Sequence, residues 1–428
     1  MILYLLAPAL ILLAFLGTPL FAVILAASMT GFYYMGIDLS VIAIEIYRIA
    51  DTPVLLALPF FTFAGYLLSE SRSSKRLVRL TEAFFGWMPG GLTIVAFVAC
   101  ALFTAFTGAS GVTIVALGAL LYPALKEAGY GDKFSIGLVT TSGSLGLLLP
   151  PSLPLILYGI IAQQMNIGKE VTIDSLFIAG FFPALLMLVL LSCWSLWVNR
   201  FSSLPLKRFS WKEVAAALRE AVWEIPLPVF VIGGIYSGFF AVSEAAAVTA
   251  MYVLVVEIFI YKEIKFSKLP VIMQDSMVMV GGIMLILGVS LASTNLMVDA
   301  EIPARLFNII RVHVNDKIIF LIILNLFLLL LGAVLDIFSA LVIIVPLILP
   351  VAVSYGINPV HLGIIFLANM QIGYFTPPVG MNLFIASYRF DKSITELYQA
   401  AIPFMIVLFA AVLVITYFPP LSLFLLQR

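Results

Sequence analysis

Hydrophobic residues form long runs along almost the whole chain, and short polar stretches separate them. A helix needs ~20 apolar residues to cross a bilayer, and the apolar runs predict ten membrane spans on this basis. The predicted spans are residues 2–16, 19–36, 53–70, 134–163, 176–198, 223–238, 241–260, 271–298, 360–388 and 398–426. The pattern therefore predicts an all-α polytopic membrane protein.

Two further apolar runs, 92–125 and 318–353, are too long for one crossing and too short for two crossings with a loop. A re-entrant helical hairpin, which enters and leaves the membrane on the same side, fits both runs. The first hairpin is expected to turn at Thr107-Gly108-Ala109-Ser110-Gly111, and the second between Gly332 and Asp336. Glycine allows such a turn because it has no Cβ.

The motif Gly-x-x-x-Pro-Pro occurs at 146–151 and again at 373–378, an offset of 227 positions. A proline pair must interrupt a membrane helix, so 134–163 and 360–388 are predicted to be broken helices. Broken helices at matching positions in two halves of a membrane protein are typical of the substrate and ion site of secondary transporters. The motif therefore predicts a transporter.

Residues 199–222 are the one sizeable polar stretch in the middle of the chain, and they carry an amphipathic pattern around Trp211. We expect a linker helix there on the cytoplasmic membrane surface. It divides the chain into two inverted repeats, 1–198 and 223–428. A second surface helix is expected at 72–88, and a solvated loop is the alternative for both stretches.

Lysine and arginine are distributed unevenly between the two sides of this predicted topology. With the N-terminus outside, sixteen of the 22 basic residues lie on the inner side, as the positive-inside rule requires. The two hairpins then enter from opposite faces. We expect a transport domain of roughly 92–163 plus 318–388, and the remaining spans are expected to form a scaffold.

Composition excludes several other classes of protein. The chain is 63% hydrophobic and only 10% charged, and its formal net charge of 0 argues against a nucleic-acid partner. Two isolated cysteines and two isolated histidines match neither a zinc site nor a Ser-His-Asp centre. No enzymatic activity, catalytic residue or organic cofactor is therefore expected.

The first hairpin tip is predicted to bind sodium. Carbonyl groups at a tip in mid-membrane need a partner, and sodium accepts oxygen ligands from unwound backbone and hydroxyl groups. A packing seam of small residues is the alternative. The residues expected at this first site are Gly108, Ser110, Ser142, Gly143 and Gly146.

The second hairpin carries an acidic residue, Asp336, at its tip. A carboxylate at mid-bilayer costs roughly 2.5–3.5 kcal/mol on insertion scales, so a role as a cation ligand or a helix cap is expected. The residues of this second predicted sodium site are Gly332, Asp336, Gln371, Gly373 and Thr376.

Neither broken helix contains lysine or arginine around its proline pair. A carboxylate substrate would therefore meet helix N-termini, hydroxyl groups and bound sodium. The expected substrate-binding residues are Ser144, Pro151, Ser152, Pro378, Asn382 and Glu244. Glu244 could instead cap the helix that begins beside it, and Glu257 is expected to extend its carboxylate to the membrane surface.

Several of these motifs resemble one known family, the large membrane subunit of the tripartite ATP-independent periplasmic (TRAP) transporters. The similarity covers essentially the whole chain. The motifs on which the similarity rests are Leu-Pro-Phe-Phe-Thr-Phe-Ala-Gly at 58–65, Thr-Gly-Ala-Ser-Gly at 107–111, Leu-Pro-Pro-Ser-Leu-Pro at 149–154, Gly-Ile-Tyr-Ser-Gly at 234–238 with Ser-Glu-Ala-Ala-Ala at 243–247, and Thr-Pro-Pro-Val-Gly at 376–380.

The resemblance implies a sodium-driven elevator-type importer of organic acids such as C4-dicarboxylates or sialic acid. It also implies a periplasmic substrate-binding protein and a small four-helix membrane subunit, which is expected to be a separate chain. The implied location is the inner membrane of a bacterium or archaeon. A stand-alone sodium/organic-anion symporter without a binding protein is the alternative function.

Overall fold

The computed structural model describes residues 10, 12–13, 18–50, 52–88, 90–200, 209–314 and 316–426, and these residues form helices and no strand. The first half contains α2 (Leu20–Met35), α3 (Ser40–Ala50), η1 (Pro53–Leu56), α4 (Ala57–Glu70), α5 (Ser73–Phe85), α6 (Gly91–Thr107), α7 (Ser110–Ala116), α8 (Gly118–Glu127), α9 (Asp132–Ser142), η2 (Leu145–Leu148), α10 (Leu153–Met165) and α11 (Ile173–Val198). The second half contains α12 (Trp211–Glu220), α13 (Pro226–Tyr236), α14 (Val242–Val255), η3 (Val256–Ile260), η4 (Phe266–Lys268), α15 (Leu269–Asp299), α16 (Ile302–His313), α17 (Lys317–Val334), α18 (Ile337–Ser354), α19 (Pro359–Gly373), α20 (Met381–Phe390), α21 (Ile394–Tyr417), α22 (Pro420–Leu423) and η5 (Phe424–Leu426).

Seven helical segments of the described residues are long and apolar enough to cross a membrane, or eight if the bent pair Asp132–Leu148 and Leu153–Met165 counts as one span. The predicted spans at 19–36 and 223–238 correspond to the shorter helices α2 and α13. The predicted span at 2–16 lies mostly outside the described residues. An all-helical membrane fold is confirmed, whereas the number of ten spans stays a prediction.

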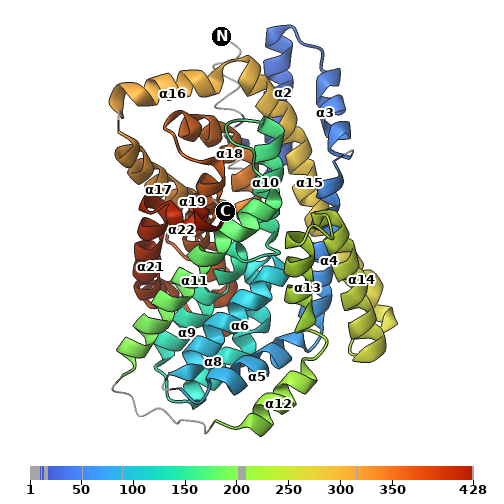
Figure 1. The fold of residues 1–428 in the computed structure, drawn as a ribbon. Coiled ribbons are helices and arrows are strands. Elements are labelled where there is room, and N and C mark those ends of the chain that lie inside the picture. The colour runs from blue at the N-terminus through green and yellow to red at the C-terminus, as the bar shows by residue number, and fades with distance from the viewer. Residues whose placement is uncertain are drawn as a thin grey trace.

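The two apolar runs of awkward length each turn back on themselves. A Cβ placed on Gly90 would lie 3.9 Å from the Tyr130 hydroxyl, so the two ends of the run α6–α8 are neighbours. In the second run, Lys317 Nζ donates a hydrogen bond of 3.2 Å to the Gly356 carbonyl, which joins the start of α17 to the end of α18. Figure 1 shows α8 near one end of the molecule and α16, which leads into α17, at the other.

Both proline pairs contain cis peptide bonds, Pro150–Pro151 and Pro377–Pro378, and both interrupt their helices. Each preceding glycine packs against a hairpin backbone. A Cβ on Gly146 would lie 2.2 Å from the Ala101 carbonyl oxygen, and a Cβ on Gly373 would lie 2.5 Å from the Gly332 Cα. Only glycine permits these approaches, so the repeated motif makes a corresponding packing contact in each half.

The two stretches predicted as surface helices are both helical, and the two helices pack together. α5 falls within 72–88 and α12 within 199–222, and the two contact each other at the end of the molecule opposite α16 (Figure 1). Residues 201–208 of the predicted linker lie outside the described residues. The helices α3 and α16 were not predicted, because each is shorter than a membrane span and carries charged residues.

Candidate functional site

The first hairpin tip is organised around Thr104, near the end of α6. Its Oγ1 lies 2.7 Å from the Thr113 hydroxyl of α7 and 2.9 Å from the Gly143 carbonyl oxygen at the end of α9. Gly108, with φ at 66°, ends α6, and α7 begins two residues later at Ser110. Both threonines are fully buried. The hydroxyl groups therefore join the hairpin tip to the first broken helix.

Asn382 of α20 connects the first tip to the second half of the chain. Ser110 Oγ donates a hydrogen bond of 2.8 Å to Asn382 Oδ1, and Asn382 Nδ2 donates one of 3.4 Å to the Thr140 carbonyl. The Asn382 side chain is completely buried. The predicted substrate residue Asn382 thus lies beside the predicted sodium residue Ser110.

The structure brings some of the first predicted sodium residues together but not all. The backbones of Ser110 and Gly143 approach closely, since a Cβ on Gly143 would lie 3.1 Å from the Ser110 carbonyl oxygen. Ser142 Oγ instead donates to the Val139 carbonyl of its own helix at 3.3 Å. Gly146 serves the contact between η2 and α6. Ser110 and Gly143 are therefore in contact at the tip, where the Gly143 carbonyl oxygen also accepts the hydrogen bond from Thr104.

The second tip has a different chemistry, because Asp336 caps α18. Its Oδ1 accepts hydrogen bonds of 3.0 Å from the backbone N–H groups of Phe338 and Ser339. The N–H of Ile337, the first residue of α18, instead donates to the Tyr374 hydroxyl at 2.9 Å. Asp336 Oδ2 accepts no hydrogen bond from the described residues. The helix-cap alternative is therefore observed, and one carboxylate oxygen is left over.

The remaining residues of the second predicted site do not converge on Asp336. Gln371 Nε2 donates to the Met187 sulfur of α11 at 3.5 Å, and Thr376 Oγ1 donates to the Ile372 carbonyl at 2.8 Å. Gly332 and Gly373 form the backbone contact described above. The two broken helices meet here, since Ser144 Oγ donates to the Gln371 carbonyl at 3.1 Å.

The other predicted substrate residues occupy scattered positions. Ser152 Oγ donates to the Leu147 carbonyl at 2.5 Å, Pro151 is buried, and the Pro378 carbonyl accepts a hydrogen bond from Tyr398. Glu244 lies on α14, which packs against α4 and η1, and its carboxylate accepts a hydrogen bond of 2.9 Å from the Ala241 N–H. For Glu244 the structure thus shows the helix-cap contact.

Two threonines lie at the contact between α4 and the first tip, and of these sequence reasoning named Thr107 in the predicted turn but missed Thr62. Thr62 and Thr107 are buried, and their hydroxyl groups have no hydrogen-bond partner among the described residues. Gly65 of α4 lies against this tip, because a Cβ there would be 2.7 Å from the Phe106 carbonyl oxygen. The Thr-x-x-Gly spacing within 62–65 places both residues on one helix face, which was the available signal.

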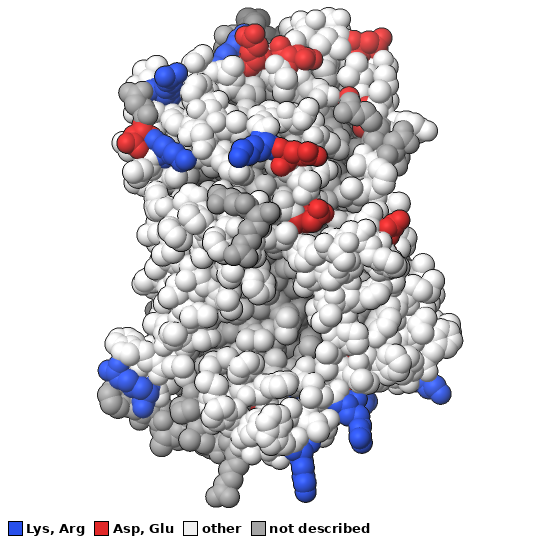
Figure 2. All heavy atoms as spheres, viewed as in Figure 1, with Lys and Arg blue, Asp and Glu red and all other residues white. Residues whose placement is uncertain are grey.

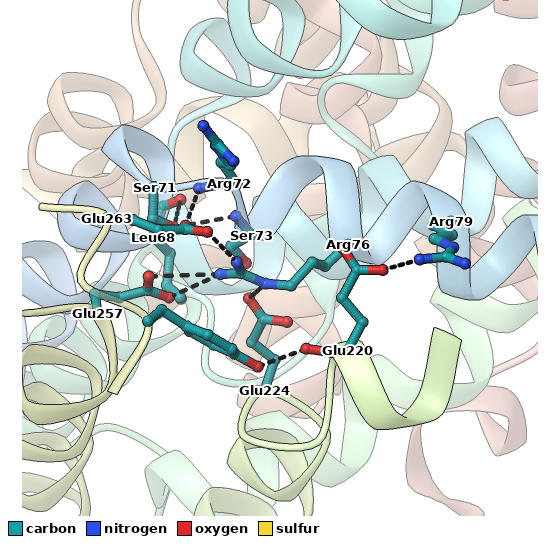
Figure 3. A network of polar contacts seen from close by, with 11 residues as sticks. Leu68, Ser71, Arg72, Ser73, Arg76, Arg79, Glu220, Glu224, Glu257 and Glu263 are labelled. Atoms are coloured by element: carbon teal, nitrogen blue, oxygen red, sulfur yellow. Dashed lines mark hydrogen bonds and ion pairs between the residues drawn. The ribbon is translucent and has the colours of Figure 1, made fainter. Parts of the chain in front are cut away.

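A buried ion-pair network at the α5 end of the molecule was also missed (Figure 3). Arg76 of α5 is 4% exposed, and its guanidinium bonds Glu224 at 2.6 Å, Glu263 at 2.7 Å and Glu257 at 3.3 Å. The prediction that Glu257 extends to the membrane surface is wrong, because its side chain is fully buried against Arg76. A buried arginine provides a stronger attraction than the distant headgroups.

Charged side chains are unevenly distributed over the surface of the molecule (Figure 2). Figure 2 shows charged side chains toward the two ends of the face in view, with a broad uncharged band between them. The hydrocarbon core of a bilayer requires an uncharged surface of this kind. Together with the helices that break within the band, this surface defines an integral membrane protein of the transport class.

The chain belongs to the tripartite ATP-independent periplasmic transporter family, as its DctM component, since the model of that family matches residues 8–421. The C4-dicarboxylate TRAP transporter large permease protein DctM of Pseudomonas aeruginosa is 34% identical over 383 residues, which cover 89% of this chain and 88% of that protein. The ectoine/5-hydroxyectoine TRAP transporter large permease protein UehC of Ruegeria pomeroyi is 30% identical and covers 97% and 96%. The chain is therefore a TRAP transporter large permease.

The chain is also similar to a longer permease and to a solved transporter structure. The isethionate TRAP transporter permease protein DctMQ of Oleidesulfovibrio alaskensis is 34% identical and covers 87% of this chain but 58% of that protein. Among solved structures, the YdaH transporter of Alcanivorax borkumensis has a TM-score of 0.64 at 14% identity, with 93% and 89% of the chains covered. This structural similarity shows the fold alone.

Proposed function

We propose that this permease imports an organic acid anion and that sodium drives the import. The observation that carries the proposal is the pairing of each hairpin with a broken helix, at contacts built from backbone and hydroxyl oxygens. Such uncharged oxygens suit sodium, and helix N-termini with bound sodium suit an anion. A proton relay would instead need a chain of titratable side chains such as aspartate, glutamate or histidine.

We place the first sodium at Gly108, Ser110 and Gly143, and the second at the free oxygen of Asp336. Ser110 and Asp336 begin the return helices α7 and α18 of their hairpins. At the first site sodium would add a ligand bond to oxygens that already bond Thr104 and Asn382, and at the second it would satisfy the Asp336 oxygen that accepts no hydrogen bond from the described residues. Asn382, hydrogen-bonded to Ser110, then lies where a substrate carboxylate and the first sodium would meet.

The substrate class follows from the relatives. Their names specify C4-dicarboxylates, isethionate and ectoine, and we propose a small acid of this kind or a sugar acid such as sialic acid. The absence of lysine and arginine around the proline pairs leaves bound sodium as the positive charge for a carboxylate.

We propose two protein partners, a periplasmic substrate-binding protein and a small membrane subunit. The name DctMQ of the isethionate permease is consistent with a small subunit joined to the large one. The alternative is a symporter that works without a binding protein. Uptake that needs no added binding protein would favour that alternative.

The mechanism we propose is the sliding of a transport domain, roughly 92–163 plus 318–388, against the remaining helices. Arg76 fixes α5 to Glu224, two residues before α13, and to Glu257 of η3, which follows α14. Bending between α5 and the first hairpin must then occur after Arg76, and the glycines Gly86, Gly90 and Gly91 supply the freedom.

The orientation we propose places the α5 end of the molecule in the cytoplasm of a bacterial or archaeal cell. The charged groups seen at that end of Figure 2 are basic, as the positive-inside rule requires. The N-terminus would then lie outside.

The test is solute uptake into proteoliposomes that contain the permease and its proposed partners. A sodium gradient should drive accumulation of one acid from a panel of C4-dicarboxylates, sulfonates and sugar acids. Each net positive charge that moves into the cell gains ~2.3 kcal/mol per 100 mV of inside-negative membrane potential. Such a potential should therefore increase uptake if the charge of the co-transported sodium ions exceeds the negative charge of the substrate. Equal uptake from sodium-free buffer under a proton gradient would overturn the proposal.

A further inference from the structure

An apolar groove lies beneath α16, between the two arms of the second hairpin. Its volume is about 540 Å³, within the ~300–1,000 Å³ of typical ligand sites. Its walls come from three helices: Leu306 and Ile310 of α16, Ile323 and Phe327 of α17, and Ile344 and Leu347 of α18. Almost every exposed atom in it is carbon.

The groove exists because the hairpin arms diverge. From the turn at Asp336, α17 packs along α19, whereas α18 packs along α10 and α16. The arms meet again at their far ends, through the stacked rings of Phe320 and Tyr355 and the hydrogen bond from Lys317 to Gly356, so the groove lies between the arms and α16, which crosses the molecule there (Figure 1). Side chains such as Ile323 and Phe327 are 48% and 42% exposed there, although they lie within a membrane-spanning length of helix.

Two basic residues follow or precede lining residues of the groove where α16 leads into α17. Arg311 and Lys317 are both exposed and lie at the junction of α16 and α17, and His313 lines the groove beside them. The nearby carboxylate of Asp316 is engaged, because it accepts a hydrogen bond of 2.6 Å from the Ile318 N–H at the start of α17. The Arg311 guanidinium lies over the Phe307 ring and the Lys317 ammonium donates to the Gly356 carbonyl, so the junction carries two exposed basic groups beside the lining residues His313 and Phe320.

We propose that this groove binds one acyl chain of a membrane phospholipid, with the lipid phosphate between Arg311 and Lys317. The apolar walls exclude a polar solute such as an organic acid from the interior of the groove. An acyl chain fits because the bilayer surrounds α17 and α18 with such chains, and a groove in which no polar atom must be buried can pack one by van der Waals contact. The two basic groups supply the complement to a phosphate. The bound lipid would support α16, which links α15 to the second hairpin.

The experiment measures lipid retention by the full chain after reconstitution with equal amounts of palmitoyl-oleoyl phosphatidylglycerol and phosphatidylethanolamine. The protein is then extracted in mild detergent and examined by native mass spectrometry. Wild-type protein should retain one phospholipid per chain. Leu347→Trp fills the groove and should reduce retention at least about tenfold, a change of ~1.4 kcal/mol or more in binding free energy.

Ile319→Trp is the matched control, because Ile319 is an exposed α17 residue that does not line the groove. It should retain lipid like the wild type. If Leu347→Trp does not fold, Ile323→Trp fills the groove from the opposite wall. The double variant Arg311→Gln/Lys317→Gln should keep a lipid but lose the preference for the anionic phosphatidylglycerol.

Equal retention by wild type and both groove-filling variants would overturn the proposal. A helix of a partner subunit found in the groove of the assembled transporter would overturn it too. The proposal does not depend on the coupling ion, so a permease driven by protons rather than sodium would leave it intact.

Discussion

At the scale of single residues, Asp336 combines two roles that mutation can separate. Its Oδ1 caps α18, and its Oδ2 is the proposed sodium ligand. Asparagine is as good an N-cap as aspartate, whereas alanine loses ~1 kcal/mol of capping. Asp336→Asn should therefore keep the melting temperature of the wild type but raise the sodium concentration needed for half-maximal uptake at least about tenfold.

Asp336→Ala should show both defects, a lower melting temperature and weaker sodium dependence. The measurements are thermal unfolding in detergent and uptake as a function of sodium concentration. If Asp336→Asn responds to sodium like the wild type, the second sodium site is not at Asp336.

Arg76 provides a second prediction about single residues. Three carboxylates surround its one guanidinium. Removing the cation leaves buried negative charges without a partner, and Arg76→Gln should cost about 3–5 kcal/mol. Glu224→Gln keeps an oxygen that can accept from Arg76 Nε and removes one negative charge, so its stability should stay close to that of the wild type.

The same network predicts the direction of a pH effect. Burial raises the pKa of Glu224 above its usual value, and the Arg76 guanidinium opposes this only in part. The folded state therefore holds a proton that the unfolded state releases near pH ~4.3, and stability falls as the pH rises through the raised pKa. The melting temperature of the wild type should decline over that range, and the decline should be smaller in Glu224→Gln. Parallel declines in the two proteins would show that Glu224 does not titrate there.

At the scale of helices, the glycine before each proline pair sets the distance between a broken helix and its hairpin. A Cβ on Gly146 would meet the Ala101 carbonyl oxygen at 2.2 Å, and this atom belongs to backbone that cannot rotate away. Gly146→Ala should therefore destabilise the protein by ~1–3 kcal/mol, the usual cost of overpacking, and should slow transport. Gly281→Ala, in the interior of α15, is the control.

A Cβ on Gly281 would meet no atom within 4 Å, and alanine favours a helix over glycine by ~1 kcal/mol. Thermal unfolding of the two variants in the same detergent makes the comparison. If Gly146→Ala is as stable as Gly281→Ala, the close approach of η2 to α6 does not hold the hairpin.

Most helices could be predicted from the sequence, because their apolar runs are long or a proline pair interrupts them. The arrangement of side chains could not. Whether the Ser142 hydroxyl faces the tip or its own helix depends on a rotamer, and both choices satisfy the same sequence pattern. The three carboxylate partners of Arg76 lie 148, 181 and 187 positions away. Local patterns carry no signal for contacts of that kind, so Glu257 was wrongly expected at the membrane surface.

At the scale of the whole molecule, the sliding mechanism requires that the proposed transport domain move against the scaffold. Ser290 of α15 and Val342 of α18 lie on opposite sides of that boundary, because Ser290 Oγ donates to the Val342 carbonyl at 2.8 Å. A disulfide needs Cα atoms ~4.4–6.8 Å apart, which this contact allows. The boundary also includes Gly65 of α4 against the Phe106 carbonyl oxygen.

The last prediction is that a crosslink across this boundary stops transport. Ser290→Cys/Val342→Cys, in a background without Cys100 and Cys193, should lose uptake on oxidation and regain it on reduction. The control pair is Gly31→Cys/Leu296→Cys, which joins α2 to α15 within the scaffold, where the side chain of Leu296 lies against Gly31. Because both helices stay together in the sliding model, this crosslink should leave uptake unchanged. Uptake that continues at full rate with residues 290 and 342 linked, as verified by mass spectrometry of the crosslinked peptide, would rule the model out.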